Sequence, residues 1–187
     1  MSIKLQDITT STNLDLTDKV LISDGTSEHL VTVETFLGRM STLYQGIKGS
    51  GAQTIADAKM YKIALASTGV EVPAGDSGME ISNGGIKVTS VGSYKVTASI
   101  YLTPSSSSYP NGVYVFYGTS FTDGAAADTG ATELCGVYDN HSQSTTIQVT
   151  GILTNVPANT IFFLVGRASN SATASVGNGW LLVERLA

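Results

Sequence analysis

Few side chains in this sequence could carry out catalysis. His29 and His141 are the two histidines and Cys135 is the single cysteine, too few for a histidine-rich or four-cysteine zinc site. Cys135 and His141 are close enough in sequence to form a nucleophile–base pair. However, the apolar neighbours of Cys135 favour a small buried strand residue, and the polar neighbours of His141 favour a solvated loop. There is also no Gly-x-Ser-x-Gly elbow or Walker A motif, so we expect a protein that is not an enzyme.

Acidic side chains gather in one predicted loop region, at Asp123, Asp128, Glu133 and Asp139. Carboxylate oxygens are the ligands that calcium prefers, but the Asp-x-Asp-x-Asp-Gly spacing of a calcium loop is missing. We therefore expect a solvated acidic region, with no metal and no cofactor.

The best candidates for ligand binding are polar loop residues with an aromatic side chain among them. Tyr109 follows four consecutive serines and precedes Pro110, and an exposed tyrosine in such a loop could stack on a sugar ring. Hydrogen bonding to a glycan needs no net charge, so a host glycan is the candidate partner. The candidate surface-binding residues are Ser107, Tyr109, Asn111, Asp123, Asp128 and Asn170.

Composition excludes several classes of protein. The chain has 187 residues, of which 42% are hydrophobic and 13% charged, unlike a disordered tail or a charged helical bundle. The net charge is −5, and beyond Lys95 only Arg167 and Arg185 are basic, so the basic surface of a nucleic-acid-binding protein is missing. We find no secretion signal and no apolar run long enough to cross a membrane.

The N-terminal third predicts a hairpin, a helix and a linker. Residues 19–23 and 28–31 are strand-like and flank an Asp24-Gly25 turn. From Thr32 the period changes, because apolar residues follow the spacing of a helix over 32–44: Val33, Phe36, Leu37, Met40, Leu43 and Tyr44. Gly46, Gly49 and Gly51 then predict a glycine-containing linker over 46–58.

The remainder, residues 59–187, predicts antiparallel β-structure. Tyr94 to Leu102 alternates apolar and polar residues with a period of two. Other short strands are predicted around it without helices between them, which is typical of a sandwich or jelly roll. The turns predicted between strands are Asn83-Gly84, Asn111-Gly112, Asp123-Gly124 and Asn178-Gly179. Residues 161–165 and 180–183 are apolar on both faces. A half-exposed strand should alternate, so we expect another copy of the chain to cover the second face of these strands, in an oligomer built on the sheet that contains the last strand.

Three segments of this region resemble the C1q/TNF-type jelly roll, particularly the versions found at the ends of bacteriophage fibres. They are the strand, Gly-x-Tyr and long strand of residues 85–99, the strand–turn–strand of residues 151–161, and the closing aromatic and aliphatic strand of residues 179–186. Ala158-Asn159-Thr160 stands where that family usually has Ala-Gly-Asp. The resemblance implies a compact homotrimer with the last strand near the threefold axis. The interface residues expected on this basis are Tyr94, Tyr101, Trp180 and Leu182.

The first 45 residues resemble the short segments by which small phage fibre proteins attach to a virion. On this basis we expect residues 1–45 to bind a capsid or tail protein, using Val20, Ile22, Phe36, Leu37 and Met40. The sequence thus predicts a homotrimeric head-fibre or decoration protein of a phage virion, made in the host cytoplasm, with a jelly-roll head exposed for adhesion. The alternatives are a tail-fibre tip and a free, lectin-like carbohydrate-binding module. An esterase-like enzyme on the same scaffold is disfavoured by the missing triad.

Overall fold

The computed structural model describes residues 19–23, 28–32, 42–72, 77–104, 111–126, 129–139, 143–169 and 173–186. The chain divides into two compact units, one of residues 1–41 with Ala187 and one of residues 42–186. The described residues of both units form strands and the turns between them, and they contain no helix.

The N-terminal unit contains an antiparallel hairpin of β1 (Lys19–Ser23) and β2 (Glu28–Thr32), with Lys19 opposite Thr32 and Ser23 opposite Glu28. The helix expected over 32–44 is wrong at both of its ends, because Thr32 belongs to β2 and residues 43 and 44 belong to β3 (Leu43–Lys48). Two adjacent apolar residues suit a helical stripe, but they also suit the two faces of a strand. Residues 33–41 of the expected helix lie outside the described residues.

The linker expected over 46–58 is also wrong, because these residues are part of the sandwich. Gly46 continues β3, and β4 (Gln53–Ala56) follows after a short turn. A Cβ at Gly46 would lie 2.7 Å from Leu65 Cδ1, closer than packed carbon atoms approach. This glycine therefore allows close packing rather than chain flexibility.

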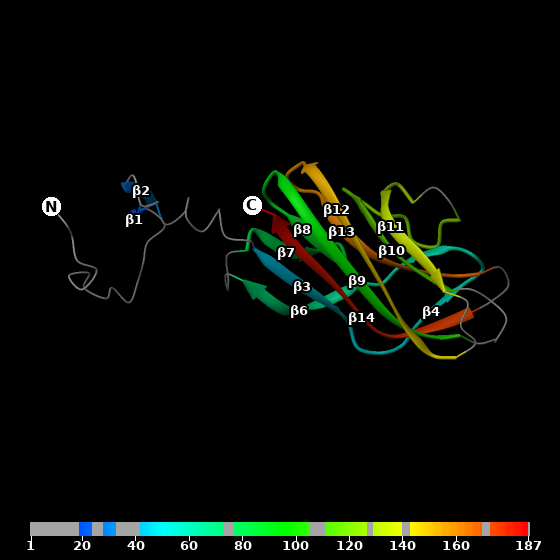
Figure 1. The fold of residues 1–187 in the computed structure, drawn as a ribbon. Coiled ribbons are helices and arrows are strands. Elements are labelled where there is room, and N and C mark those ends of the chain that lie inside the picture. The colour runs from blue at the N-terminus through cyan, green and yellow to red at the C-terminus, as the bar shows by residue number, and fades with distance from the viewer. Residues whose placement is uncertain are drawn as a thin grey trace. The chain divides into compact units, whose positions relative to one another are not determined.

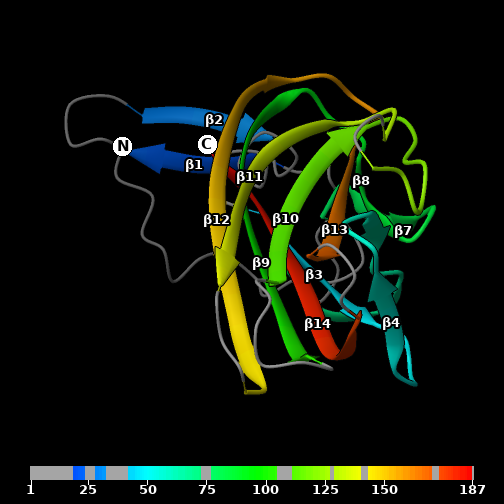
Figure 2. The same ribbon diagram turned by 90° about the vertical axis from the view of Figure 1, so that its right-hand side faces the viewer.

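The larger unit consists of two antiparallel sheets (Figures 1 and 2). The first sheet has the order β11–β10–β13–β8–β7, and β5 pairs with β13. Its strands are β5 (Met60–Lys62), β7 (Met79–Ser82), β8 (Gly85–Val88), β10 (Asn111–Gly118), β11 (Thr132–Asp139) and β13 (Ile161–Ala168).

The second sheet has the order β12–β9–β14–β3–β6, and β4 pairs with β14. Its further strands are β6 (Leu65–Val72), β9 (Gly92–Pro104), β12 (Thr145–Val156) and β14 (Thr173–Leu186). The last strand thus lies at the centre of this sheet, between β9 and β3 (Figure 1).

The main core lies between the two sheets. Alternate residues of β9 point into it, from Tyr94 to Leu102, as the period of two predicts. On the first sheet, Phe162 meets Tyr94 with the ring centroids 6.0 Å apart. The antiparallel, mainly β architecture predicted from the sequence is confirmed.

A second apolar cluster covers the opposite face of β13. Phe163 and its apolar neighbours pack against Phe116 of β10 and Phe121 of the following segment. Backbone hydrogen bonds between Met60 and Ala125 and between Gly124 and Met60, each 2.8 Å long, hold that segment in place. The two-faced apolar run 161–165 is therefore covered by its own chain, and the expectation that another copy covers it is wrong.

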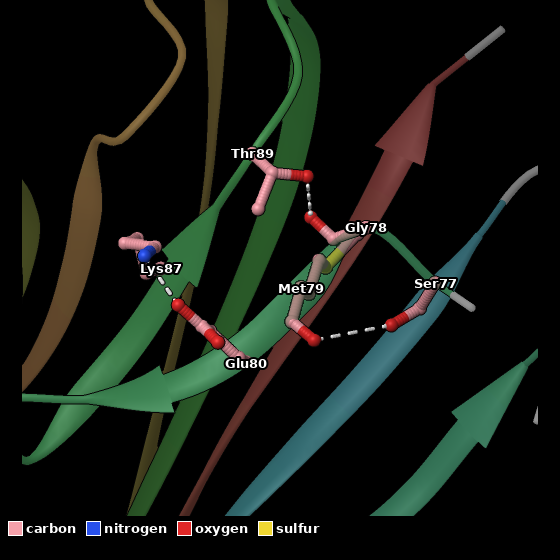
Figure 3. Close-up of polar contacts among 6 residues, drawn as sticks. All are labelled: Ser77, Gly78, Met79, Glu80, Lys87 and Thr89. Atoms are coloured by element: carbon pink, nitrogen blue, oxygen red, sulfur yellow. Dashed lines mark hydrogen bonds and ion pairs between the residues drawn. The ribbon is translucent and has the colours of Figure 1, made fainter. Parts of the chain in front are cut away.

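The β7–β8 hairpin turns at Asn83-Gly84, as the sequence predicts, and both residues have positive φ angles, 52° and 75°. At its open end, the Thr89 hydroxyl donates to the Gly78 carbonyl at 2.9 Å, and Glu80 pairs with Lys87 across the strands (Figure 3). Asn-Gly is the pair that best tolerates this turn, so the local sequence fixes the hairpin register.

The β4–β5 turn contains Asp57 and Ala58 at φ angles of 58° and 57°. Since a Cβ is disfavoured in this region, Ala58→Gly is expected to raise the free energy of unfolding by about 1 kcal/mol. Urea unfolding would measure the change. As a control, Ala56→Gly in β4 should lower stability, because glycine weakens a strand. Equal losses from both variants would contradict this interpretation of the turn.

Candidate functional site on the outer face of the second sheet

The outer face of the second sheet displays the side chains that alternate with the core residues. On β14 these include Trp180 and Leu182, whereas Leu181 and Val183 point inward and are fully buried. The register places Trp180 between Ser99 of β9 and Ile47 of β3. Side chains from three strands therefore meet around the indole.

One side of this face is apolar. We call Trp180, Leu182, Ile47 and Val70 the apolar half; they lie on β14, β3 and β6. Ile47 is 39% exposed and Val70 is 45% exposed. Val70 lies opposite Gln45 in the pairing of β3 with β6, and Gln45 lies opposite Leu182. The described part of the larger unit leaves these apolar side chains at least partly exposed to water.

The other side of the face is mainly polar, apart from Ile152 of β12, which is 59% exposed and lies opposite Lys95. We call Thr97, Ser99, Thr146, Gln148 and Thr150 the hydroxyl half; they lie on β9 and β12. Thr97 and Thr150 share a hydrogen bond of 3.1 Å between their hydroxyl oxygens.

Toward the end of β14, Lys95 Nζ lies 3.6 Å from Glu184 Oε2. Both side chains of this pair are partly exposed, so it contributes little to the stability of one chain.

A hollow of about 310 Å³ lies where the two halves meet. Its lining residues come from β9, β12 and β14: Ser99, Tyr101, Thr146, Asn178, Gly179 and Trp180. The pairing of β14 with β9 shifts between Val176 and Gly179, so this strand has a β-bulge at the rim of the hollow. Bulges redirect side chains and are common beside functional sites.

The four residues expected at a trimer interface lie in two places. Trp180, Leu182 and Tyr101 lie on the outer face, and Tyr101 is 40% exposed. Tyr94 is 1% exposed in the core, and its hydroxyl donates to the Ser90 carbonyl at 2.7 Å. The expectation for Tyr94 is wrong, because its strand position is one of the inward ones.

The expected surface-binding loop residues are not brought together in the described part of the chain. Asn111 is buried at the start of β10 rather than exposed in a loop, so that expectation is wrong. Asp123 is exposed, but its carboxylate accepts a hydrogen bond of 2.6 Å from the Lys62 amide and so stabilises a turn. Outside the described residues lie Ser107, Tyr109, Asp128 and Asn170.

The expected attachment residues belong to the N-terminal unit. Val20 and Ile22 lie in β1, and Phe36, Leu37 and Met40 lie outside the described residues.

The candidate nucleophile Cys135 lies half-buried in β11, and His141 lies outside the described residues. Burial raises the pKa of the Cys135 thiol, and the nearby Glu133 carboxylate raises it further. Since the thiolate is the reactive form, we expect iodoacetamide to modify Cys135 at pH 8 about tenfold more slowly than free cysteine. The rate should rise with pH and reach that of free cysteine in the unfolded chain. A native rate equal to the unfolded rate would contradict the expectation.

The described residues contain no group of three or more His, Cys, Asp and Glu side chains placed to hold a metal ion. They also contain no helix of the length and apolar character that crosses a bilayer.

Comparison with solved structures identifies the architecture. Murine APRIL at pH 5.0 superposes with a TM-score of 0.56 and 13% identity, over 79% of this chain and 100% of that chain. The Eiger TNF of S. frugiperda superposes with a TM-score of 0.54 and 14% identity, over 79% of this chain and 92% of that chain. The fold is a TNF-type jelly roll.

At these identities the TNF-type jelly roll is shared as a fold alone. PRD1 vertex protein P5 also matches, with 13% identity over 78% of this chain and 97% of that chain, but its TM-score of 0.46 supports no argument about this chain. No protein-family model matches the sequence, and no curated protein matches it.

Sequence reasoning missed the hollow, although one signal was present. Gly177 and Gly179 flank Asn178 inside an otherwise apolar strand pattern. Glycine inside a strand often marks a bulge, whereas Asn178-Gly179 was expected to be a turn between strands. In the TNF-type jelly roll of this chain, the Asn178-Gly179 pair lies within β14. Both residues line the hollow on the outer face of the second sheet.

Proposed function

We propose that this chain is a non-enzymatic structural protein that assembles as a homotrimer through the outer face of its second sheet. The observation that carries the proposal is the apolar half, in which Trp180, Leu182, Ile47 and Val70 lie together on one face. Apolar patches of this kind mark interaction surfaces. The occupant that we propose is a second copy of the chain.

The contrast between the two sheets supports self-association. The outer face of β13 is also apolar, and Phe121 and its neighbours cover it within the same chain. On the second sheet the described residues provide no equivalent cover for Leu182. β14 is the central strand of that sheet, so an assembly built on this face would bury it most completely.

Threefold symmetry is proposed from the resemblance of residues 85–99, 151–161 and 179–186 to C1q/TNF-type jelly rolls. In that arrangement β14 would lie nearest the axis, and threefold symmetry would turn the same face of each chain toward that axis. Trp180, Leu182 and Tyr101 are the interface residues retained in the proposal.

We further propose that the trimer is part of a phage virion, as a head fibre or decoration protein. The support is the resemblance of the jelly-roll segments to bacteriophage fibre ends and of residues 1–45 to virion-attachment segments. The N-terminal unit would bind a capsid or tail protein through Val20, Ile22, Phe36, Leu37 and Met40. Three heads in each trimer, repeated over a particle, would raise avidity for a host surface without tight single-site affinity.

Light scattering coupled to size exclusion tests the assembly. The expected mass is three times the chain mass of 19.4 kDa, and a monodisperse single chain at micromolar concentration would contradict it. Deleting residues 1–41, which precede the larger unit, is expected to preserve the trimer and abolish incorporation into virions. Incorporation of the shortened chain at the normal level would contradict the attachment role.

A further inference from the structure

We propose that the outer face of the first sheet binds an acidic sugar, one that carries a carboxylate, beside Arg167 and Tyr138. This inference rests on the adhesive role proposed above and adds a ligand class and a place for it. The two sheets pack through their inner faces, so the proposed interface lies on the opposite side of the sandwich. Assembly through the second sheet therefore leaves this site open to a ligand.

The site is a row of three residues on neighbouring strands. Gly112 of β10 lies opposite Tyr138 of β11 on one side and opposite Arg167 of β13 on the other. Arg167 Cζ lies 5.5 Å from the centroid of the Tyr138 ring, so the cation and the ring meet across the glycine. Tyr138 is 44% exposed, and an exposed tyrosine ring can stack on the C–H face of a sugar.

The guanidinium of Arg167 is oriented by the chain but is not neutralised by it. The ion pairs among the described side chains are Lys87–Glu80 and Lys95–Glu184, and neither includes Arg167. Arg167 Nε donates to the Ala58 carbonyl at 2.9 Å, which uses one of the five N–H donors of a guanidinium. The donors on the two Nη atoms suit a carboxylate, which a guanidinium binds through two parallel hydrogen bonds. An acidic ligand is therefore favoured over a neutral one.

A buried hydroxyl beneath the row also points to a ligand. Tyr114 is 5% exposed, and its hydroxyl makes no hydrogen bond of normal distance and angle to the described residues. A Cβ at Gly112 would lie 3.1 Å from Tyr114 Oη, so this hydroxyl lies over the glycine of the row. Burial raises the pKa of Tyr114 and Tyr138 raises it further, whereas Arg167 lowers it; the hydroxyl thus remains a donor at neutral pH. A buried polar group of this kind is uncommon and often marks a bound water or ion.

The row also lies at the end of the larger unit that suits adhesion. Thr42, where that unit begins, accepts a hydrogen bond of 2.8 Å from the Arg185 amide near the end of β14. The row lies at the other end, where β10 begins and β11 and β13 finish. β14 starts after the connection from β13 and runs the length of the sandwich (Figure 1). A chain anchored through residues 1–41 would therefore join its anchor at the end of the sandwich farthest from the row.

Saturation-transfer NMR and calorimetry with glucuronic acid and N-acetylneuraminic acid test the proposal, with methyl glucoside as the neutral comparison and acetate as the simple anion. The full chain is expected to bind at least one of the two acids saturably, and at least tenfold more tightly than methyl glucoside or acetate. Arg167→Gln and Tyr138→Ala should each weaken binding at least tenfold. Lys87→Gln removes the same charge near the start of β13, opposite Ile161, and should leave binding unchanged.

Absence of saturable binding to both acids by the full chain would overturn the proposal. Binding of methyl glucoside or acetate as tight as that of the acids would also overturn it. Circular dichroism shows which variants are folded, and unchanged binding by either folded variant would contradict the site. Tyr138→Ala alters an exposed side chain and decides the matter if Arg167→Gln does not fold.

Light scattering on the same samples separates this result from the assembly. A trimer mass without binding of either acid contradicts the acidic-sugar site alone. Binding by a protein of single-chain mass contradicts the trimer alone.

Discussion

Leu182→Asp is expected to convert the trimer into single folded chains. Leu182 lies in the apolar half, one outer position from Trp180 and one from Glu184. A carboxylate buried there in an assembly would lie one outer position from Glu184 of the same strand, and Lys95 on this face is already paired with Glu184, so its burial should cost several kcal/mol. We therefore expect association to weaken by at least about a hundredfold. Sedimentation equilibrium would measure the loss.

The effect of Leu182→Asp on the folding stability of the single chain should be small, because Leu182 is only partly buried in one chain. Circular dichroism and urea unfolding of the variant should show a folded jelly roll. Ser120→Asp adds the same charge at an exposed position after β10 and should leave the mass at three chains. A Leu182→Asp protein that keeps the trimer mass would show that this face is not the interface.

Phe163→Ala is expected to give the largest loss of folding stability, about 3–5 kcal/mol. Phe163 is fully buried on the outer side of β13, with its ring centroid 5.6 Å from that of Phe121. Removing the Phe163 ring leaves a cavity between the first sheet and the segment around Phe121 that covers this sheet. Urea unfolding of the variant, in the Leu182→Asp background, would measure the loss.

This loss should not depend on protein concentration, because the covering residues belong to the same chain. Phe163→Leu, which keeps most of the volume, should cost less than about 1.5 kcal/mol. If the loss from Phe163→Ala grew with protein concentration, a second copy would contribute to the cover. That result would restore the expectation drawn from the sequence for residues 161–165.

The comparison of β13 with β14 shows what the sequence could predict. Both are apolar on both faces, so a period-two analysis predicts cover for each, and the structure shows that cover for β13. It does not indicate the source of the cover, because Met60 and Phe121 reach β13 from distant parts of the chain. Long-range contacts of this kind follow from topology, which a single sequence specifies only indirectly.

The strands themselves were more predictable than their ends. Tyr94 to Leu102 alternates so regularly that β9 and its inward face follow from the pattern. At the start of the larger unit the same reasoning failed, because Leu43 and Tyr44 fit a helical stripe as well as a strand. Pairing of β3 with β14 and β6 decides between the two, and local spacing contains no information about that pairing.

The candidate site was predicted in part. Trp180, Leu182 and Tyr101 were placed at a shared surface, which the register of β14 with β9 explains. Tyr94 was misplaced, because an aromatic residue on a long strand can point to either side. The hollow was missed because it depends on a bulge that brings Asn178 beside Tyr101 and Thr146.

The fluorescence of Trp180, the one tryptophan in the chain, tests the central claim most directly. The full chain, diluted in steps from micromolar concentration while its mass is followed by light scattering, should show blue-shifted emission shielded from acrylamide at three chain masses. Emission should shift to the red, and quenching should increase, only as the mass falls to one chain or when Leu182 is replaced by Asp. Red-shifted, readily quenched emission from a protein of three chain masses would contradict the claim that this face joins the copies.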